Sequence, residues 1–303
     1  MNYGPTPGRV LTAMVTPFTR DGAVDYAGAR RLASALVDSG SDGVVVTGTT
    51  GEAPTLSAPE KLRLWSEVKD ELGARASVIA GSGDNCTADT IDLSREAVRT
   101  GVDALLLTTP YYNKPTQEGI ERHFAAVADA VAAPCIPYNI PGRTGVNVTA
   151  ETQLRLARLG NVIGVKESSG DLAQIARVIE GAGPGFRVWS GNDEDTFHVV
   201  SMGGYGVISV ATHLVGRQVA AMVAAAAAGR TGEAAALHRR LLPLVDALFC
   251  VTNPVPVKYA LGQLGVPVGG FRLPLCEPDD ASAARIMAEV RRHTIDLPIA
   301  ARA

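Results

Sequence analysis

The sequence predicts an α/β fold: a closed (β/α)8 (TIM) barrel followed by a C-terminal helical extension. Two observations carry this prediction. Eight short apolar runs rich in β-branched residues begin roughly 20 to 34 residues apart, which is the length of one βα unit. Amphipathic stretches with helix start and stop signals separate the runs, and the strand pattern ends after the eighth run.

The eight runs are expected to be parallel strands of one closed sheet. They are Val10–Val15, Gly43–Thr47, Ser77–Ala80, Ala104–Thr108, Cys135–Ile140, Val162–Lys166, Arg187–Ser190 and Val207–Val210. An open doubly wound sheet is the structural alternative. Its marker, a G-x-G-x-x-G turn after the first strand, is absent from the sequence.

Helix signals lie between the strands. Ser57–Glu60 forms a capping box, and Gly73 ends the apolar periodicity that follows it. Asp25 is an N-cap candidate, and Gly40 is the matching stop. These signals predict helices of the length that a (β/α)8 barrel requires.

Two regions are expected along the chain. Residues 1–215 would form the catalytic barrel, and residues 216–303 would form a helical region packed on it. Breaks in the helical region are predicted at Pro243, Pro254, Pro256 and the stretch Gly265–Pro278. No low-complexity linker separates the two regions.

The composition excludes several classes of protein. Of the 303 residues 46% are hydrophobic and 19% are charged, with a net charge of −3, so the chain is globular and has no basic block that would indicate nucleic-acid binding. No apolar run reaches the ~20 residues needed to span a membrane. The start has no secretory signal pattern and the four cysteines are far apart, so a reduced, cytoplasmic location is expected.

No metal is expected, because the histidines lack the spacing of a ligand set. They are His123, His198, His213, His238 and His293.

Lys166 is the main candidate for a catalytic residue. The chain has only five lysines, and Lys61 and Lys69 are expected on the polar surface of a helix. Lys166 instead lies in an apolar strand, where a period of two places it with Gly164 on the inner face, leaving space above the glycine. Burial lowers the pKa of a lysine, and a neutral amine can attack a ketone to form a Schiff base. A structural pairing of Lys166 with the carboxylate of Glu167 or Asp193 is the alternative.

Polar residues also follow the ends of other strands, where the active site of such a barrel lies. In the segment Gly48–Glu52, the hydroxyls of Thr49 and Thr50 and nearby backbone N–H groups could bind a carboxylate. Glycine and threonine are also common where a strand ends in a turn, which is the alternative interpretation. In the segment Tyr138–Gly145, Tyr138 could relay protons and Arg143 could bind a carboxylate. A core tyrosine and a surface arginine are equally consistent with these positions.

Two further strand ends belong to this set. The pair Tyr111–Tyr112 follows the fourth strand, and one of the two tyrosines could serve a site or an interface. The seventh and eighth strands end in Ser190–Asp193, which contains Gly191, and Gly206–Ser209, which contains Ile208. The glycines of these segments would let a substrate approach the backbone.

Taken in order, these segments resemble the dihydrodipicolinate synthase family of bacterial lysine biosynthesis, within the class I pyruvate-dependent lyases. The resemblance extends from Val10 to about Pro274. It is carried by Gly48–Glu52, Thr109–Asn113, Tyr138–Gly145, Gly164–Glu167 and Asn253–Lys258. N-acetylneuraminate lyase and ketodeoxygluconate aldolases share several of these features, and Arg143 in its P-G-R-T-G loop favours the synthase branch.

The resemblance implies a role for each candidate residue. Lys166 would form an imine with pyruvate, and a proton relay would serve the reaction through Tyr138, Thr49 and Tyr112, the last of these reaching in from a neighbouring subunit. The substrate-binding residues would be Thr50 for the pyruvate carboxylate, Gly191 and Ile208 for the pyruvate pocket, and Arg143 for L-aspartate-4-semialdehyde.

The resemblance also implies partners and regulation. It implies no cofactor and a homotetramer made of two tight dimers. The positions that correspond to a serine and two histidines in lysine-inhibited members carry Ala53, Ala58 and Lys61. We therefore expect weak or absent feedback by lysine, and inhibition at sub-millimolar lysine would contradict this.

Three other functions remain open from the sequence alone. They are an aldolase acting on a sugar acid or hydroxy-oxoglutarate, a non-catalytic barrel that senses keto acids, and a flavin-dependent barrel oxidoreductase. Turnover of the semialdehyde and the colour of the purified protein distinguish them.

Overall fold

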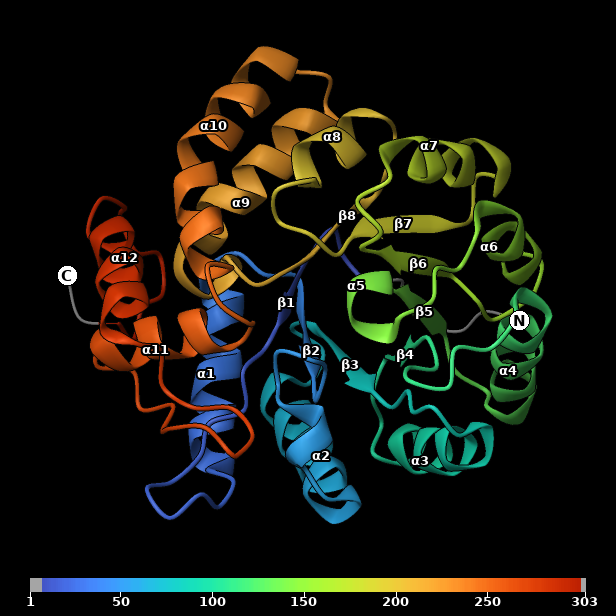
Figure 1. Ribbon diagram of the computed structural model, residues 1–303, viewed down its shortest axis with the longest axis horizontal. Coiled ribbons are helices and arrows are strands. Elements are labelled where there is room, and N and C mark those ends of the chain that lie inside the picture. The colour runs from blue at the N-terminus through green and yellow to red at the C-terminus, as the bar shows by residue number, and fades with distance from the viewer. Residues whose placement is uncertain (1–6, 301–303) are drawn as a thin grey trace.

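The strands form a closed parallel barrel in which each strand pairs with the next and β8 pairs with β1 (Figure 1). A computed structural model describes residues 7–300. The strands are β1 (Val10–Ala13), β2 (Gly43–Val46), β3 (Ser77–Gly81), β4 (Ala104–Thr108), β5 (Cys135–Asn139), β6 (Gly164–Glu167), β7 (Arg187–Ser190) and β8 (Gly206–Ser209). Each strand overlaps its predicted run, which confirms the (β/α)8 barrel.

Helices surround the strands and follow them in the chain. They are α1 (Tyr26–Asp38), α2 (Ala58–Leu72), α3 (Thr87–Arg99), α4 (Gln117–Ala130), α5 (Pro141–Thr144), α6 (Ala150–Leu156), α7 (Leu172–Gly181), α8 (Thr196–Ser201), α9 (Thr212–Ala227), α10 (Thr231–Leu248), α11 (Val255–Gln263) and α12 (Asp280–Val290). The capping box predicted at Ser57 and Glu60 is formed at the start of α2. A short 3-10 helix, Ala53–Thr55, precedes it.

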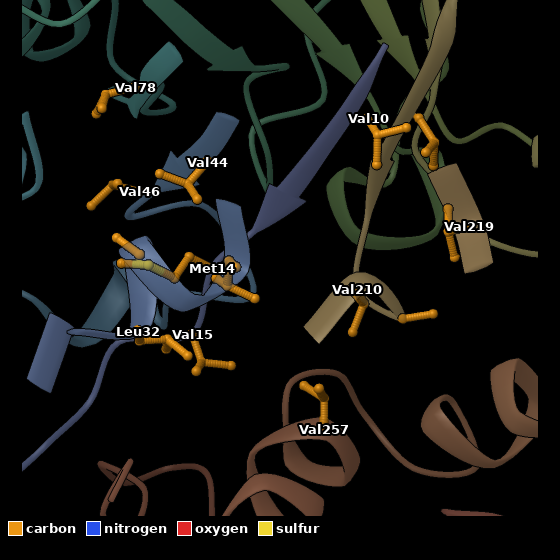
Figure 2. Close-up of a cluster of buried hydrophobic side chains, with 14 of the residues drawn as sticks. Val10, Met14, Val15, Leu32, Val44, Val46, Val78, Val210, Val219 and Val257 are labelled. Atoms are coloured by element: carbon orange, nitrogen blue, oxygen red, sulfur yellow. The ribbon is translucent and has the colours of Figure 1, made fainter. Parts of the chain in front are cut away.

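The strand side chains alternate between two apolar clusters, as parallel strands buried on both faces require. On β2, Val44 and Val46 face the helices and belong to the large outer cluster, part of which Figure 2 shows. Val45, between them, belongs to the inner cluster with Trp189 and Ile208. The barrel interior is therefore filled by side chains, and polar groups on inward positions near the strand ends lie at the top of this core.

The helices after β8 cover one side of the barrel, where they are coloured orange to red in Figure 1. Val257 of α11 is buried in the same cluster as Val15 and Val210, so the C-terminal region shares the core of the barrel (Figure 2). The predicted break at Pro243 is wrong, because α10 runs through this residue. A proline interior to a helix removes one backbone hydrogen bond but does not have to end the helix.

The predicted boundary between residues 215 and 216 falls within α9, beside Val215, whose backbone angles are not helical. None of the helices within residues 7–300 combines the length and apolar character that a membrane span needs.

Candidate active site

Lys166 lies on β6 with its side chain directed into the barrel, as the alternation along the strand predicts. The side chain is only 6% exposed, whereas the adjacent Val165 packs on the helix side of the sheet. Tyr138 of β5 is its register partner, and Lys166 Nζ lies 4.2 Å from the centroid of the Tyr138 ring. The space expected above Gly164 is not present, because a Cβ there would lie 2.7 Å from a ring carbon of Trp189.

Burial lowers the pKa of the Lys166 amine to about 7. The negative charge of Asp193 opposes this shift, and the positive charge of Arg143 adds to it. A substantial fraction of the amine is therefore unprotonated near neutral pH, which is the form that can act as a nucleophile.

The two carboxylates considered as structural partners of Lys166 are both engaged elsewhere. Glu167 points to the opposite side of the strand, where its oxygens accept hydrogen bonds from the side-chain amides of Asn139 and Gln153. Asp193 accepts hydrogen bonds from the Ser209 hydroxyl and from the backbone N–H groups of residues 210 and 211. Asp193 therefore acts on Lys166 through its charge.

Tyr138 is buried beside the lysine, and burial raises the pKa of its phenol to about 12. The Ser168 hydroxyl and the charge of Arg143 act in the opposite direction. The phenol is thus protonated at neutral pH and can donate a proton or a hydrogen bond beside the amine.

The loop after β2 holds Thr49 and Thr50 in a compact turn. The N–H of Gly51 donates to the Gly48 carbonyl at 3.0 Å, and the N–H of Glu52 donates to the Thr49 carbonyl at 3.1 Å. Glu52 has a φ of 55°, in the left-handed region that side chains other than glycine rarely adopt. The surroundings must therefore hold this conformation in place.

A fully buried ion pair holds this turn against the C-terminal region. Lys258 Nζ lies 2.6 Å from a carboxylate oxygen of Glu52, and both side chains are inaccessible to solvent. The other oxygen of Glu52 accepts a hydrogen bond from the backbone N–H of Arg272 at 3.2 Å. The ring of Phe18 lies over the ammonium group, with its centroid 4.0 Å from Lys258 Nζ. The sequence contained both charged residues within its motifs but did not indicate that they pair.

Asn253 links two of the predicted substrate-binding residues, a contact that sequence reasoning missed. Its side-chain amide donates to the Thr50 hydroxyl at 2.9 Å, and its backbone carbonyl accepts from Nη2 of Arg143 at 3.1 Å. The segment Asn253–Lys258 carried the family resemblance, so it was visible as a motif. Its contacts join positions more than 100 residues apart, which no local pattern reveals.

Gly191 and Ile208 also lie at this end of the barrel. A Cβ at Gly191 would lie 2.0 Å from Ser168 Oγ and 2.8 Å from Lys166 Cε, so only glycine fits beside the lysine. Ile208 is fully buried in the inner cluster of the barrel.

Tyr112 lies on the surface of the single chain. Its side chain is 88% exposed, and its backbone has a φ of 71°. Its N–H donates to the Thr144 carbonyl at 3.3 Å, so the loop after β4 is attached to α5, the helix that carries Arg143.

A cavity of about 450 Å³ adjoins this set of residues, and Thr49 and Arg143 line it together with Lys61, Asp84 and Tyr111. Lys61, expected on a polar helix surface, is half-buried in the wall of this cavity, where burial lowers the pKa of its amine and the charge of Asp84 opposes that shift. The helix period placed Lys61 on the polar face of α2, but the start of that helix adjoins the loops that surround the cavity.

The histidines lie apart from the amine. Burial lowers the pKa of His123 and His213 to about 4, so both rings are neutral at pH 7. In the described part of the chain, no group of three or more His, Cys, Asp or Glu residues is arranged to hold a metal ion.

The closed parallel barrel with a buried, low-pKa lysine on one of its strands is that of a (β/α)8-barrel enzyme. The model of the dihydrodipicolinate synthetase family matches residues 6–293. The chain belongs to this family.

The chain is similar to several named relatives over nearly the whole length of each. It is 56% identical to the 4-hydroxy-tetrahydrodipicolinate synthase of Symbiobacterium thermophilum, over 94% of this chain and 98% of that one. It is 53% identical to the enzyme of the same name from Dehalococcoides mccartyi, over 96% and 98% of the two chains. A crystal structure of the synthase from Cyanidioschyzon merolae with lysine bound has a TM-score of 0.92 and 43% identity, over 93% of this chain and 96% of that one.

Proposed function

We propose that this protein condenses pyruvate with L-aspartate-4-semialdehyde to 4-hydroxy-tetrahydrodipicolinate, in the biosynthesis of diaminopimelate and lysine. The names of the full-length relatives support this reaction over that of a sugar-acid aldolase. The observation that carries the mechanism is the buried Lys166 amine, with a pKa of about 7, lying against the ring of Tyr138.

The reaction begins when the unprotonated amine of Lys166 attacks the ketone carbon of pyruvate. The carbinolamine then loses its hydroxyl, which leaves as water after taking up a proton, and the C=N bond of a protonated imine forms. A methyl proton passes to the proton relay while the electron pair of its C–H bond moves to the imine. The resulting enamine attacks the aldehyde carbon of the second substrate, whose oxygen takes up a proton from the relay. The amino group of that substrate displaces Lys166 and closes the ring.

The surrounding residues bind the substrates and transfer protons. Tyr138 gives the proton that leaves with water and takes one back during ring closure, and Thr49 and Tyr112 complete the relay to solvent. Thr50 holds the carboxylate of pyruvate.

Two residues define the pocket for pyruvate, and one selects the second substrate. Gly191 and Ile208 line the pyruvate pocket. Arg143 binds the carboxylate of L-aspartate-4-semialdehyde, for which a planar guanidinium with two parallel donors is suited. Its position on α5, at the edge of the cavity, supports this role.

Trapping with borohydride tests the proposal. The protein is incubated with pyruvate and sodium borohydride, and the labelled peptide is identified by mass spectrometry. We expect one reduced pyruvyl group on Lys166 and none on the other four lysines. Turnover of L-aspartate-4-semialdehyde is then compared with that of sugar-acid and hydroxy-oxoglutarate aldols. An unlabelled Lys166 would refute the mechanism, and a preference for the aldols would refute the substrate assignment.

The rate of imine formation is expected to rise with pH and to level off above about pH 7. Only the unprotonated amine reacts, and Lys166 loses its proton as the pH passes through its pKa of about 7. Removing the positive charge in Arg143→Gln should raise this pKa and move the rising limb to higher pH. The trapping rate is measured against pH in both proteins. An unchanged limb in the variant would contradict the electrostatic contact.

Asn253→Ala is expected to lower kcat/KM by roughly 10-fold, because Thr50 loses the side-chain amide that fixes its position. The hydrogen bond from Arg143 goes to the backbone carbonyl of residue 253 and is kept in this variant. Steady-state kinetics with both substrates measure the effect. Asn161→Ala is the control, since Asn161 is a buried amide that donates to the Ala128 carbonyl at the opposite end of β6. We expect the control to lower the melting temperature without this kinetic loss, and equal losses in both variants would contradict a positioning role.

The assembly we propose is a homotetramer of two tight dimers, in which Tyr112 enters the site of the neighbouring subunit. The exposed, outward position of Tyr112 supports this arrangement. Sedimentation analysis is expected to give a tetramer. Mixing inactive Lys166→Ala subunits with inactive Tyr112→Phe subunits should restore part of the activity, because each mixed dimer contains one complete site and one site that lacks both residues. No restored activity in verified mixed dimers would contradict a shared site.

We also propose a cytoplasmic location, where thiols stay reduced. Within residues 7–300 the cysteines are free, and Cys135 is buried with a pKa raised by burial to about 12, so its thiol is inert.

A further inference from the structure

Ser168 lies on the same side of the chain as the catalytic lysine. Gly164, Lys166 and Ser168 alternate along β6 and just beyond its end, so the side chains of Lys166 and Ser168 point to the inner face. Ser168 is 8% exposed, and among the described residues its hydroxyl has no well-formed hydrogen bond; its interaction with the Tyr138 phenol lacks the full geometry of one. A buried hydroxyl without a partner costs free energy, so its presence calls for an explanation.

The hydroxyl borders the reacting atoms. A Cβ placed on Gly191 would lie 2.0 Å from Ser168 Oγ and 2.8 Å from Lys166 Cε, so both groups adjoin one point in space. The hydroxyl also lies near enough to Tyr138 to counteract the effect of burial on the pKa of the phenol. Ser168 is thus a neighbour of both residues that carry the proposed chemistry.

Ser168 contributes to the pairing of the strands through its backbone and not through its hydroxyl. Its N–H donates to the Asn139 carbonyl at 2.8 Å, which continues the pairing of β5 and β6. An alanine would keep this hydrogen bond, so the strand end does not require the hydroxyl.

We propose that Ser168 is a positioning residue for proton transfer at Tyr138, and that its hydroxyl donates a hydrogen bond to the phenolic oxygen when pyruvate is bound. Catalytic hydrogen bonds are often long in unliganded sites and shorten in the complex. When the C–O bond of the carbinolamine breaks, the departing hydroxyl takes the phenol proton and leaves a phenolate at Tyr138. The donor at Ser168 stabilises that charge and keeps the oxygen aimed at the reacting carbon. This inference rests on the proposed function.

Ser168→Ala tests the inference with three measurements. We expect kcat to fall roughly tenfold with little change in the KM for pyruvate. The phenol of Tyr138 should titrate at higher pH in an ultraviolet titration, assigned by comparison with Tyr138→Phe. The melting temperature should stay equal or rise, because the variant removes a buried hydroxyl that lacks a partner.

Ser169→Ala is the matched control. Ser169 is the next residue along the chain, and its hydroxyl accepts a hydrogen bond from the Asp171 N–H in a turn. We expect this control to keep the kcat and the Tyr138 titration of the wild type. A Ser168→Ala protein that does the same, or that loses activity only in step with a lowered melting temperature, would overturn the inference. If Lys166 of the wild type is not labelled by pyruvate and borohydride, the proposed function itself fails.

Discussion

Replacing Lys166 with alanine is expected to lower kcat by at least about 10³-fold and to abolish trapping of pyruvate. The amine forms the covalent intermediate, so no neighbouring group can substitute for it. Lys166→Met, which keeps most of the side-chain volume, should show the same loss. A coupled steady-state assay and mass spectrometry after borohydride treatment measure the two effects.

The loss of activity in the Lys166 variants must be distinguished from a loss of folding. The pKa of Lys166 is about 7 in the folded protein, below its ordinary value of 10.5, so the unfolded chain binds more protons between these values. The free energy of unfolding of the wild type should therefore rise with pH between about 7 and 10.5. Lys166→Met should lack this pH dependence, because it has no amine to titrate. Lys69→Ala, which removes a lysine paired with Asp103 on the outside of the barrel, should retain turnover. Turnover near the wild-type level in either Lys166 variant would refute the assignment.

Replacing Lys258 with methionine is expected to reduce the free energy of unfolding by about 3–5 kcal/mol. The substitution leaves the Glu52 carboxylate buried beside Phe18 without its cation. Because Glu52 ends the turn that carries Thr49 and Thr50, we also expect a higher KM for pyruvate. Melting temperatures at a fixed protein concentration and steady-state kinetics measure these changes.

The double variant Glu52→Gln with Lys258→Met provides the control. It removes both charges, so most of the lost stability should return, since the penalty comes from the unpaired charge. A double variant that is no more stable than Lys258→Met would contradict this explanation.

Strand periodicity predicted the barrel well because its signal is local. Alternation alone placed Val45 inside and Val44 and Val46 outside, as the structure has them. Prediction was wrong at Pro243, where the packing of α10 against its neighbours outweighs the local cost of a proline. The same alternation could have identified Ser168, which follows Gly164 and Lys166 on the inner face of β6.

The site was predicted in part. The pairing of Lys166 with Tyr138 follows from adjacent strands that end at the same edge of the barrel. The contacts of Asn253 depend on how the C-terminal helices lie on the barrel, and no spacing in the sequence encodes this. The half-buried position of Lys61 could not be predicted for a related reason, since a helix period gives the polar face but not the loops that cover it.

Each alternative to the synthase is decided by a different observation. The relatives favour the synthase over the sugar-acid aldolase. The trapping experiment tests the non-catalytic sensor, because a sensor does not need an amine of lowered pKa beside a phenol. Labelling of Lys166 would therefore argue against a sensor. A colourless purified protein would dismiss the flavin-dependent oxidoreductase.

The barrel closes by the pairing of β1 with β8, which needs no residue beyond Ser209. Asn253 and Lys258, which come much later in the chain, contact the loop after β2. During synthesis on the ribosome, every strand is available well before the last residues that brace the pocket. A fragment ending before Asn253 would therefore contain Lys166 and all eight strands yet lack the brace on Thr50 and Arg143. Enzyme engineers who shorten or permute this chain need to keep that late segment attached.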